Sequence, residues 1–218
     1  DEGDAYNSLI LNRSLNNLRS RNIFASVKET TKIGSSSDLK IIDIEIEEKA
    51  TGEISIGAGV GTSGGTLGFK LSENNFMGKG IVLDTSLNIT EQQFTGKFSV
   101  QNPNYNYSGN AVTTTLVSST TDRSKDFGYQ TDKWAFNLST FFEQYEDIYM
   151  SPEISSSYET LQTDSKASSS IKKQEGSYFD TNFLYSIISD KRDQKFQTTE
   201  GYRLSFTQDL PIYSSSPN

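Results

Sequence analysis

The chain has 218 residues and an acidic balance, with 28 Asp and Glu against 20 Lys and Arg and a formal net charge of −8. This charge argues against a nucleic-acid partner, which needs a basic surface. The absence of His and Cys excludes Ser-His-Asp triads, thiolate or imidazole metal sites and disulfides. Aromatic residues make up 11% of the chain, which favours a sheet protein with one polar face over a disordered chain. No apolar run approaches the roughly 18 residues of a membrane helix, and we expect no cofactor and no bound metal.

Residues 1–49 differ from the rest of the chain and predict a small mixed α+β module. Asn7 or Ser8 can cap a helix whose apolar positions recur at helical spacing, at Leu11, Leu15 and Leu18. Asn22 lies where a left-handed residue would end that helix. Two strands are predicted next, at 25–33 and 39–48. Such a core is very small, so we expect further elements before residue 1 and interpret the chain as an internal piece of a longer protein.

The second predicted strand alternates cleanly between isoleucines and acidic residues. We expect the face formed by Ile42, Ile44 and Ile46 to be half buried. The opposite face carries a row of carboxylates that could suggest a calcium or catalytic site: Asp43, Glu45 and Glu47, followed by Glu48. A calcium site would need oxygen ligands clustered in space and usually a glycine-bearing loop. We therefore favour a solvated strand face.

From Gly52 onward the chain has no helical period, and about nine segments of roughly ten residues alternate apolar and polar positions. In the first segment one face carries Ile54, Ile56, Ala58 and Val60. The fifth segment, 110–117, is rich in Thr, and the seventh, 148–161, is weak because it contains Pro152. Segments of about 9–11 residues are long enough to cross a bilayer as tilted strands. The pattern predicts antiparallel up-and-down strands of a transmembrane β-barrel.

The connections between these segments differ on the two sides of the predicted meander. The long polar connections, 118–133 and 162–177, fall on one side, as extracellular loops would. Aromatic residues fall on the other side, as in an interfacial girdle: Phe76, Tyr105, Tyr107, Tyr145 and Phe196. A soluble β-sandwich would also alternate, but its turns usually recur every 8–12 residues. We favour the barrel, with the helical module on the aromatic side.

Several motifs, in chain order, resemble the BamA/TamA superfamily of outer-membrane proteins. Residues 17–27 resemble its "L–x–x–x–G-F-F–x–x–V" helix end, and 42–49 its closing "V-x-V-x-V-x-E-K/R" strand. The glycine-rich run 51–61 resembles the first barrel strand, and "x-x-N-x-x-G-x-G" and "N-P" turns follow at 73–80 and 102–103. Residues 193–203 resemble a "D-R-x-x-x-P-T-D-G-x-R" turn, with departures at Gln194, Thr198 and Glu200.

The resemblance implies a mainly β chain in two parts. Residues 1–49 would be the C-terminal part of the last POTRA domain, in the periplasm, and 50–218 the N-terminal part of a transmembrane barrel, about nine of sixteen strands. It further implies a non-enzymatic role in outer-membrane protein assembly in a Gram-negative bacterium. Partners would be nascent β-barrel proteins, accessory periplasmic lipoproteins and membrane lipid. Alternatives are a TamA-like transporter, a two-partner secretion exporter or a passive porin.

The first barrel segment and the start of the second are rich in glycine, since 7 of the 16 glycines lie from Gly52 to Gly68. Glycine weakens a strand through entropy and lost packing, so the seam beside this strand would open easily and a client strand could add to its edge. The resemblance implies the same role, a lateral gate made of Glu53, Ile54, Ser55, Ile56, Gly57, Ala58, Gly59, Val60 and Gly61. Alternatively, the glycines only make room for lumenal side chains or let the strand bend.

The predicted helix carries arginines on its polar side and just beyond its end: Arg13, Arg19 and Arg21. The superfamily docks accessory lipoproteins on this module, and the three arginines could supply polar contacts to such a partner. A solvated helix face is the alternative.

Overall fold

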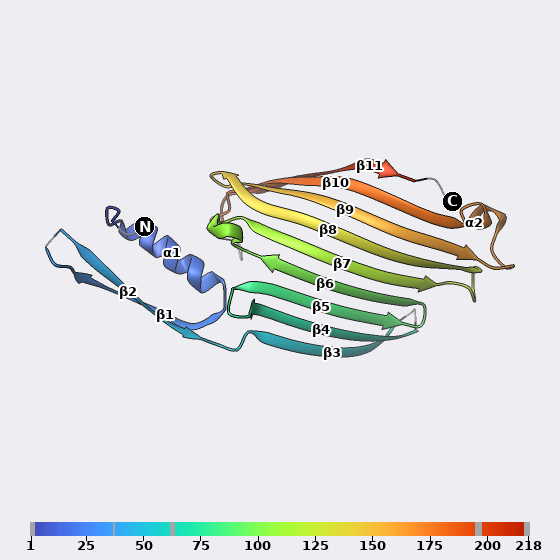
Figure 1. Cartoon of the computed structure of the whole chain (residues 1–218), viewed down its shortest axis with the longest axis horizontal. Helices are drawn as coiled ribbons and strands as arrows, with labels where there is room; N and C mark the ends of the chain where they lie inside the picture. The colour runs from blue at the N-terminus through green and yellow to red at the C-terminus, as the bar shows by residue number, and fades with distance from the viewer. Residues whose placement is uncertain (1–2, 37, 62–63, 195–197, 216–218) are drawn as a thin grey trace.

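The computed structural model describes residues 3–36, 38–61, 64–194 and 198–215, which form an N-terminal module beside one end of a curved sheet (Figure 1). The module contains α1 (Ser8–Ser20), β1 (Phe24–Ile33) and β2 (Lys40–Glu48). The sheet contains β3 (Gly52–Gly61), β4 (Gly64–Phe76), β5 (Ile81–Thr90), β6 (Gln93–Asn102), β7 (Ala111–Asp122), β8 (Tyr129–Tyr145), β9 (Ile148–Thr163), β10 (Gly176–Asp190) and β11 (Arg203–Ser214).

The nine strands of the sheet follow one another in space in chain order, from β3 at one edge to β11 at the other. Every neighbouring pair is antiparallel. This is the up-and-down meander of barrel strands that the alternating segments predicted, and the fold-class prediction is confirmed. The strand ends next to the module are called the module end below, and the opposite ends the far end.

The register separates apolar from polar side chains onto two faces. Across β3, β4 and β5, Ile56 is paired with Phe69 and Phe69 with Leu87, all on one face. On the other face Lys70 is paired with Ser86 and Ser86 with Lys97. The same separation continues through β10, because directly paired residues share a face and successive residues alternate.

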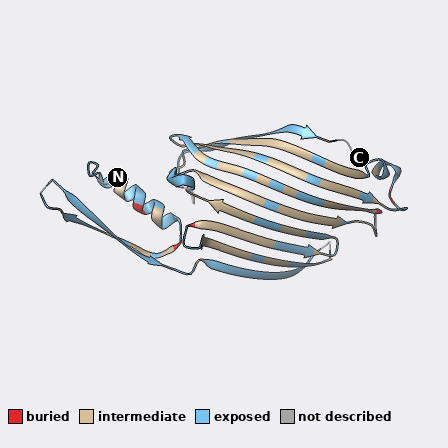
Figure 2. Cartoon of the chain, viewed as in Figure 1, coloured by how far each residue is buried: buried red, intermediate tan, exposed pale blue. Residues whose placement is uncertain are grey.

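The sheet is a single layer and has no dry core. Among the described residues the buried apolar side chains are Leu15, Ile23 and Ala167, none of which lies in a sheet strand. Figure 2 shows both sheet faces as intermediate or exposed. A β-sandwich would bury one face of each of two layers, so the soluble-sandwich alternative is excluded for the described residues.

The polar face is held by hydrogen bonds between strands. The Ser155 hydroxyl donates to Asn137 Oδ1 over 2.8 Å, and the Ser99 and Thr115 hydroxyls are 3.0 Å apart. Lys133 Nζ lies 3.5 Å from Glu159 Oε2. These contacts link β6 to β7 and β8 to β9 across the face that a barrel would turn toward its lumen.

Strands β7 to β10 are longer than the sequence predicted. Residues 118–133 and 162–177 were expected to be long loops. Most of 118–133 continues β7 and β8 and leaves a connection at 123–128, whereas only the ends of 162–177 belong to strands and 164–175 remains a long connection. The many Thr and Ser residues in these two stretches had favoured the prediction of polar loops. In the structure those in the strands form continuous ladders, such as Thr121 with Thr131.

Pro152 does not break β9, although it weakened the prediction there. It is paired with Tyr185 on the β10 side, whereas the β8 register passes from Glu153 directly to Met150. Proline has no N–H to donate, so only one of the two ladders has to be interrupted.

Two short helical segments fall where no helix was expected after Gly52. They are the 3-10 turn η1 (Tyr105–Tyr107) and α2 (Ser169–Lys172), the latter with Ser168 at its N-cap. Both are too short to produce a helical period in the sequence.

The far-end connections pack against one another. Gly128 has φ of +71°, and a Cβ there would lie 2.3 Å from the Ala167 nitrogen. Asp164 N donates to the Gly128 carbonyl over 2.8 Å. This close approach of the β7–β8 turn to the β9–β10 loop therefore requires glycine.

The module begins as predicted. Asn7 caps α1 by accepting hydrogen bonds from the Leu9 and Ile10 amides, Leu15 is buried, and Asn22 has φ of +56° after the helix end. None of the helices among the described residues is long and apolar enough to span a membrane.

The prediction of a half-buried β2 is wrong. All nine of its residues are exposed, including Ile42, Ile44 and Ile46 at 40–44%. Strand β2 pairs with β1 alone, and α1 packs mainly against β1, so no described element covers the isoleucine face. The acidic face behaves as the solvated strand that was favoured, with Lys32 Nζ 2.6 Å from Asp43 Oδ2.

Aromatic side chains gather at the module end of the sheet. Phe76, Tyr105, Tyr107 and Tyr145 lie there with large exposed fractions, up to 94% for Tyr107. Phe196, the fifth member of the predicted girdle, lies outside the described residues.

Candidate functional site

Strand β3 forms one edge of the sheet. It pairs with β4 along its whole length, from Gly52 with Glu73 to Gly61 with Gly64, and no described strand lies on its other side. All ten of its residues are exposed (Figure 2), with Ile56 at 75% and Val60 at 92%. An edge strand presents unpaired backbone N–H and C=O groups, which can pair with another strand.

The polar face of β3 carries Glu53 and Ser55 near the module end and no side chain beyond them. Gly57, Gly59 and Gly61 alternate there, and Gly57 is paired with Gly68 on β4. A Cβ would meet nothing within 4 Å at Gly57 or Gly61. Lumenal crowding by the described residues therefore does not explain these two glycines.

Two other glycines do have close neighbours. A Cβ would lie 3.1 Å from Thr66 Oγ1 at Gly59, and 3.3 Å from Asn88 Oδ1 at Gly68. Close packing therefore favours glycine at Gly59 and Gly68, whereas Gly57 and Gly61 have open space around the Cβ position.

The start of β3 is anchored to β4. The Thr51 hydroxyl donates to the Glu73 carboxylate, and the same Glu73 oxygen accepts from the Asn75 amide over 2.7 Å. The strand is thus held at its module end by side chains, and beyond that by one backbone ladder.

The three arginines of the predicted docking surface point to different places. Arg19 Nη2 donates to the Val27 carbonyl over 3.2 Å, within the module. Arg21 Nη1 lies 3.6 Å from the position of a Cβ at Gly80, in the β4–β5 turn, and Arg13 is within electrostatic range of Tyr149 on β9. A role for them in binding an accessory partner stays a prediction.

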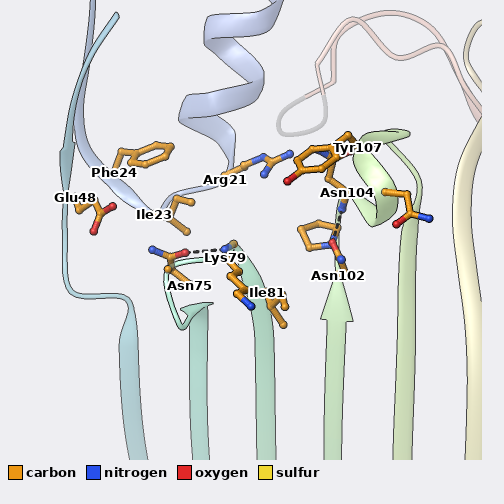
Figure 3. Close-up of a pocket in the computed structure, with 14 residues that line it drawn as sticks. Arg21, Ile23, Phe24, Glu48, Asn75, Lys79, Ile81, Asn102, Asn104 and Tyr107 are labelled. Carbon is orange, nitrogen blue, oxygen red and sulfur yellow. Dashed lines mark hydrogen bonds between the residues drawn. The ribbon is translucent and has the colours of Figure 1, made fainter.

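A cleft lies between the module and the turns at the module end, and no pattern in the sequence indicated it. Its volume is about 680 Å³. Figure 3 shows Arg21, Ile23, Phe24 and Glu48 of the module facing the β4–β5 turn and the β6–β7 connection. The lining comes from separate segments, so no local spacing could have revealed it.

Asp193 joins the two described sides of the β10–β11 connection. The Thr199 hydroxyl donates to Asp193 Oδ2 over 2.6 Å, and the Thr199 and Glu200 amides donate to Oδ1 over 3.2 Å. The Thr199 hydroxyl foremost, and then the backbone amides, lower the pKa of Asp193 to about 2 against the opposing effect of desolvation. Asp193 is therefore bonded to Thr199 and Glu200 although Gln194, Thr198 and Glu200 depart from the motif.

The described part of the chain holds no group of three or more acidic side chains placed to bind a metal ion. The candidate functional features of the described residues are an open strand edge and a cleft.

The family model of the Omp85 superfamily domain matches residues 75–216, more than half of the chain. The chain belongs to the Omp85 superfamily. The matched residues begin near the end of β4, so β3 and the module precede them. A comparison with curated protein sequences finds no match.

Two solved structures are similar to this Omp85 chain. One is BamA from Haemophilus ducreyi lacking POTRA domains 1-3, with TM-score 0.72 and 15% identity over 93% of this chain and 42% of that one. The other is CdiB from Acinetobacter baumannii, with TM-score 0.47 and 10% identity over 93% of this chain and 41% of that one.

The likeness to BamA shows the fold, and the likeness to CdiB is too weak to support an inference. This Omp85 chain spans less than half the length of either solved chain. The Omp85 barrel fold implies the Gram-negative outer membrane, and the resemblance to the BamA/TamA superfamily is confirmed at the level of superfamily and fold. Members of this superfamily act in outer-membrane protein assembly or transport.

Proposed function

We propose that the chain takes part in inserting nascent β-barrel proteins into the outer membrane, with β3 as a lateral gate that pairs with client strands. The observation that carries this proposal is the glycine run of β3: Gly57, Gly59 and Gly61 leave the far half of its polar face without side chains, whereas β11, the other exposed edge of the described sheet, contains no glycine. Unpaired backbone groups in hydrocarbon each cost several kcal/mol, so a client strand gains strongly by pairing there. The role is non-enzymatic.

The proposal assigns the two parts of the chain to two compartments. Residues 1–49 are proposed to be the C-terminal part of a last POTRA domain in the periplasm, and 50–218 the N-terminal part of the barrel. The position of the module beside one end of the strands (Figure 1) supports this division. Nascent outer-membrane proteins are the proposed clients, and accessory periplasmic lipoproteins the proposed partners of the module.

Site-specific crosslinking tests the gate. The chain has no native Cys, so Ser55→Cys introduces a single thiol on the edge strand. We expect this thiol to form disulfides with single cysteines in a client's terminal strand while the client is being assembled. The trapped pairs should depend on register, since backbone pairing fixes which residues face each other.

The matched control is Ser157→Cys on β9, which faces the same side of the sheet but is paired on both edges, with Ala135 and Asp180. No client should be trapped there. Trapping at neither position, or equally at both, would contradict the gate. Export of a soluble passenger without trapping would favour the secretion alternatives.

A further inference from the structure

The cleft between the module and the sheet has a lining that suits an anion. Two cations, Arg21 and Lys79, line it against one carboxylate, Glu48. Neither cation forms an ion pair with any described residue. The positions are enforced by the fold, because Arg21 packs over Gly80, a buried residue with φ of +64°.

Three asparagines add hydrogen-bond donors to the same lining. The Asn75 side-chain carbonyl accepts from Gly80 N over 2.7 Å, Asn102 from Asn104 N over 3.0 Å, and Asn104 from Gly109 N over 2.7 Å. Because each carbonyl is used inside its own turn, each amide NH₂ remains as a donor without a partner among the described residues. The lining thus offers cations and N–H donors, and a phosphate offers only acceptors.

The cleft also touches the apolar face of the sheet. Leu83 is paired with Val100 on that face, and Ile81 and Asn102, two residues nearer the module, line the cleft. The exposed rings of Tyr105 and Tyr107 lie at this level, where interfacial aromatic residues meet lipid headgroups. A ligand in the cleft can therefore place a polar group beside the cations and an apolar tail along the strands.

We propose that this cleft binds the phosphate headgroup of an anionic phospholipid from the leaflet at the module end. Arg21 and Lys79 face the phosphate, the asparagine amides donate to its oxygens, and the acyl chains run past Ile81 along the apolar face. Basic pockets at the membrane surface bind anionic headgroups in this way. The bound lipid would join the module to the sheet. This inference depends on the barrel fold and not on the proposed role in assembly.

Native mass spectrometry of the full chain in detergent tests the site, with phosphatidylglycerol as the probe and phosphatidylcholine as the zwitterionic reference. We expect wild type to prefer phosphatidylglycerol. The double variant Arg21→Gln/Lys79→Gln should lose affinity for it by about fivefold for each cation removed. The control Lys28→Gln/Lys40→Gln removes the same charge from exposed positions of β1 and β2 outside the cleft, and should leave the preference unchanged.

A gain of affinity separates binding from folding. Glu48→Gln removes the single carboxylate of the cleft lining and should tighten phosphatidylglycerol binding, an effect that misfolding cannot produce. An unchanged preference in the Arg21/Lys79 variant, an equal loss in the Lys28/Lys40 control or no gain in Glu48→Gln would overturn the site. Displacement of the lipid by millimolar inorganic phosphate would overturn the lipid assignment in favour of a free anion.

Discussion

One edge of the sheet, β3 with β4, and its interior strands β8, β9 and β10 are built from the same alternation but differ in what holds them. Strand β9 has 16 residues and a ladder on each side, and hydroxyl and amide side chains link it to its neighbours. Strand β3 has 10 residues, one ladder, and glycines on its polar face. Side-chain bonds therefore reinforce the ladders of β9, whereas the glycine-bearing half of β3 is held by its backbone ladder to β4.

This contrast assigns different tasks to the two regions. The central strands have a backbone ladder on both sides, and side chains add further bonds. In the proposed gate, β3 would exchange partners, and little besides its ladder and the Thr51–Glu73 anchor would have to break. A sheet in which every pair of strands was held equally strongly would have no single place at which strands separate most easily.

The largest expected effect tests whether both regions turn their apolar side chains to lipid. Phe136→Arg on β8 and Ile56→Arg on β3 place a charge on the apolar face, and each should lower the free energy of unfolding by about 2–4 kcal/mol near the bilayer midplane. Ala135→Arg and Ser55→Arg, one residue before each on the polar face, should cost much less. Denaturant unfolding in lipid bilayers measures both pairs. Equal costs on the two faces would contradict the face assignment.

An intermediate effect is expected from stiffening the edge strand. Gly57→Val and Gly61→Val add side chains where nothing lies within 4 Å of the Cβ position, and each should stabilise β3 pairing by about 0.5–1 kcal/mol. Slower hydrogen exchange of β3 amides would report the stabilisation, and slower client assembly its consequence.

Ser157→Val on β9 is the control for that experiment, because it adds a β-branched residue to a strand already paired on both sides. It should leave client assembly unchanged. Destabilisation by Gly57→Val would show instead that these glycines are needed for packing within the closed barrel.

The smallest expected effect concerns the turn that connects β10 to β11. The pKa of Asp193 is lowered from 3.8 to about 2, so its ionised form is favoured in the folded chain. Its contribution to stability is fully present above about pH 4 and is lost as the pH falls toward 2. The difference in unfolding midpoint between wild type and Asp193→Asn should be constant above pH 4 and shrink below it. A difference that does not change with pH would rule out this role for Asp193.

Several elements could be predicted from the sequence because their signals are local. The Asn7 cap, the left-handed Asn22 and the alternation in β3 each depend on residues within a few positions of one another. The lengths of β7 to β10 could not be predicted, because Thr and Ser suit both loops and strands that face a polar lumen. The exposure of Ile42, Ile44 and Ile46 was missed because alternation shows which residues share a face, and says nothing of what covers it.

The site divides in the same way. The glycine-rich β3 could be predicted from the sequence, since seven glycines cluster in the short stretch that contains it. The different contacts of Arg13, Arg19 and Arg21 could not be predicted from the sequence, because each contact depends on where the helix lies against other elements. The cleft could not be predicted from the sequence either, although two of the turns that line it match the "x-x-N-x-x-G-x-G" and "N-P" motifs.

The amino-acid sequence by itself determined an antiparallel meander with one apolar and one polar face, because side chains alternate with a period of two whatever lies around the strand. It also determined where the glycines gather, and because glycine lowers strand stability this predicts a weak first strand of the sheet. Only the tertiary structure decided that β3 lies at an edge of the described sheet and that Arg21, Lys79 and three asparagines converge on one cleft. Edges and clefts are made by contacts between segments far apart in the chain, which no local pattern encodes.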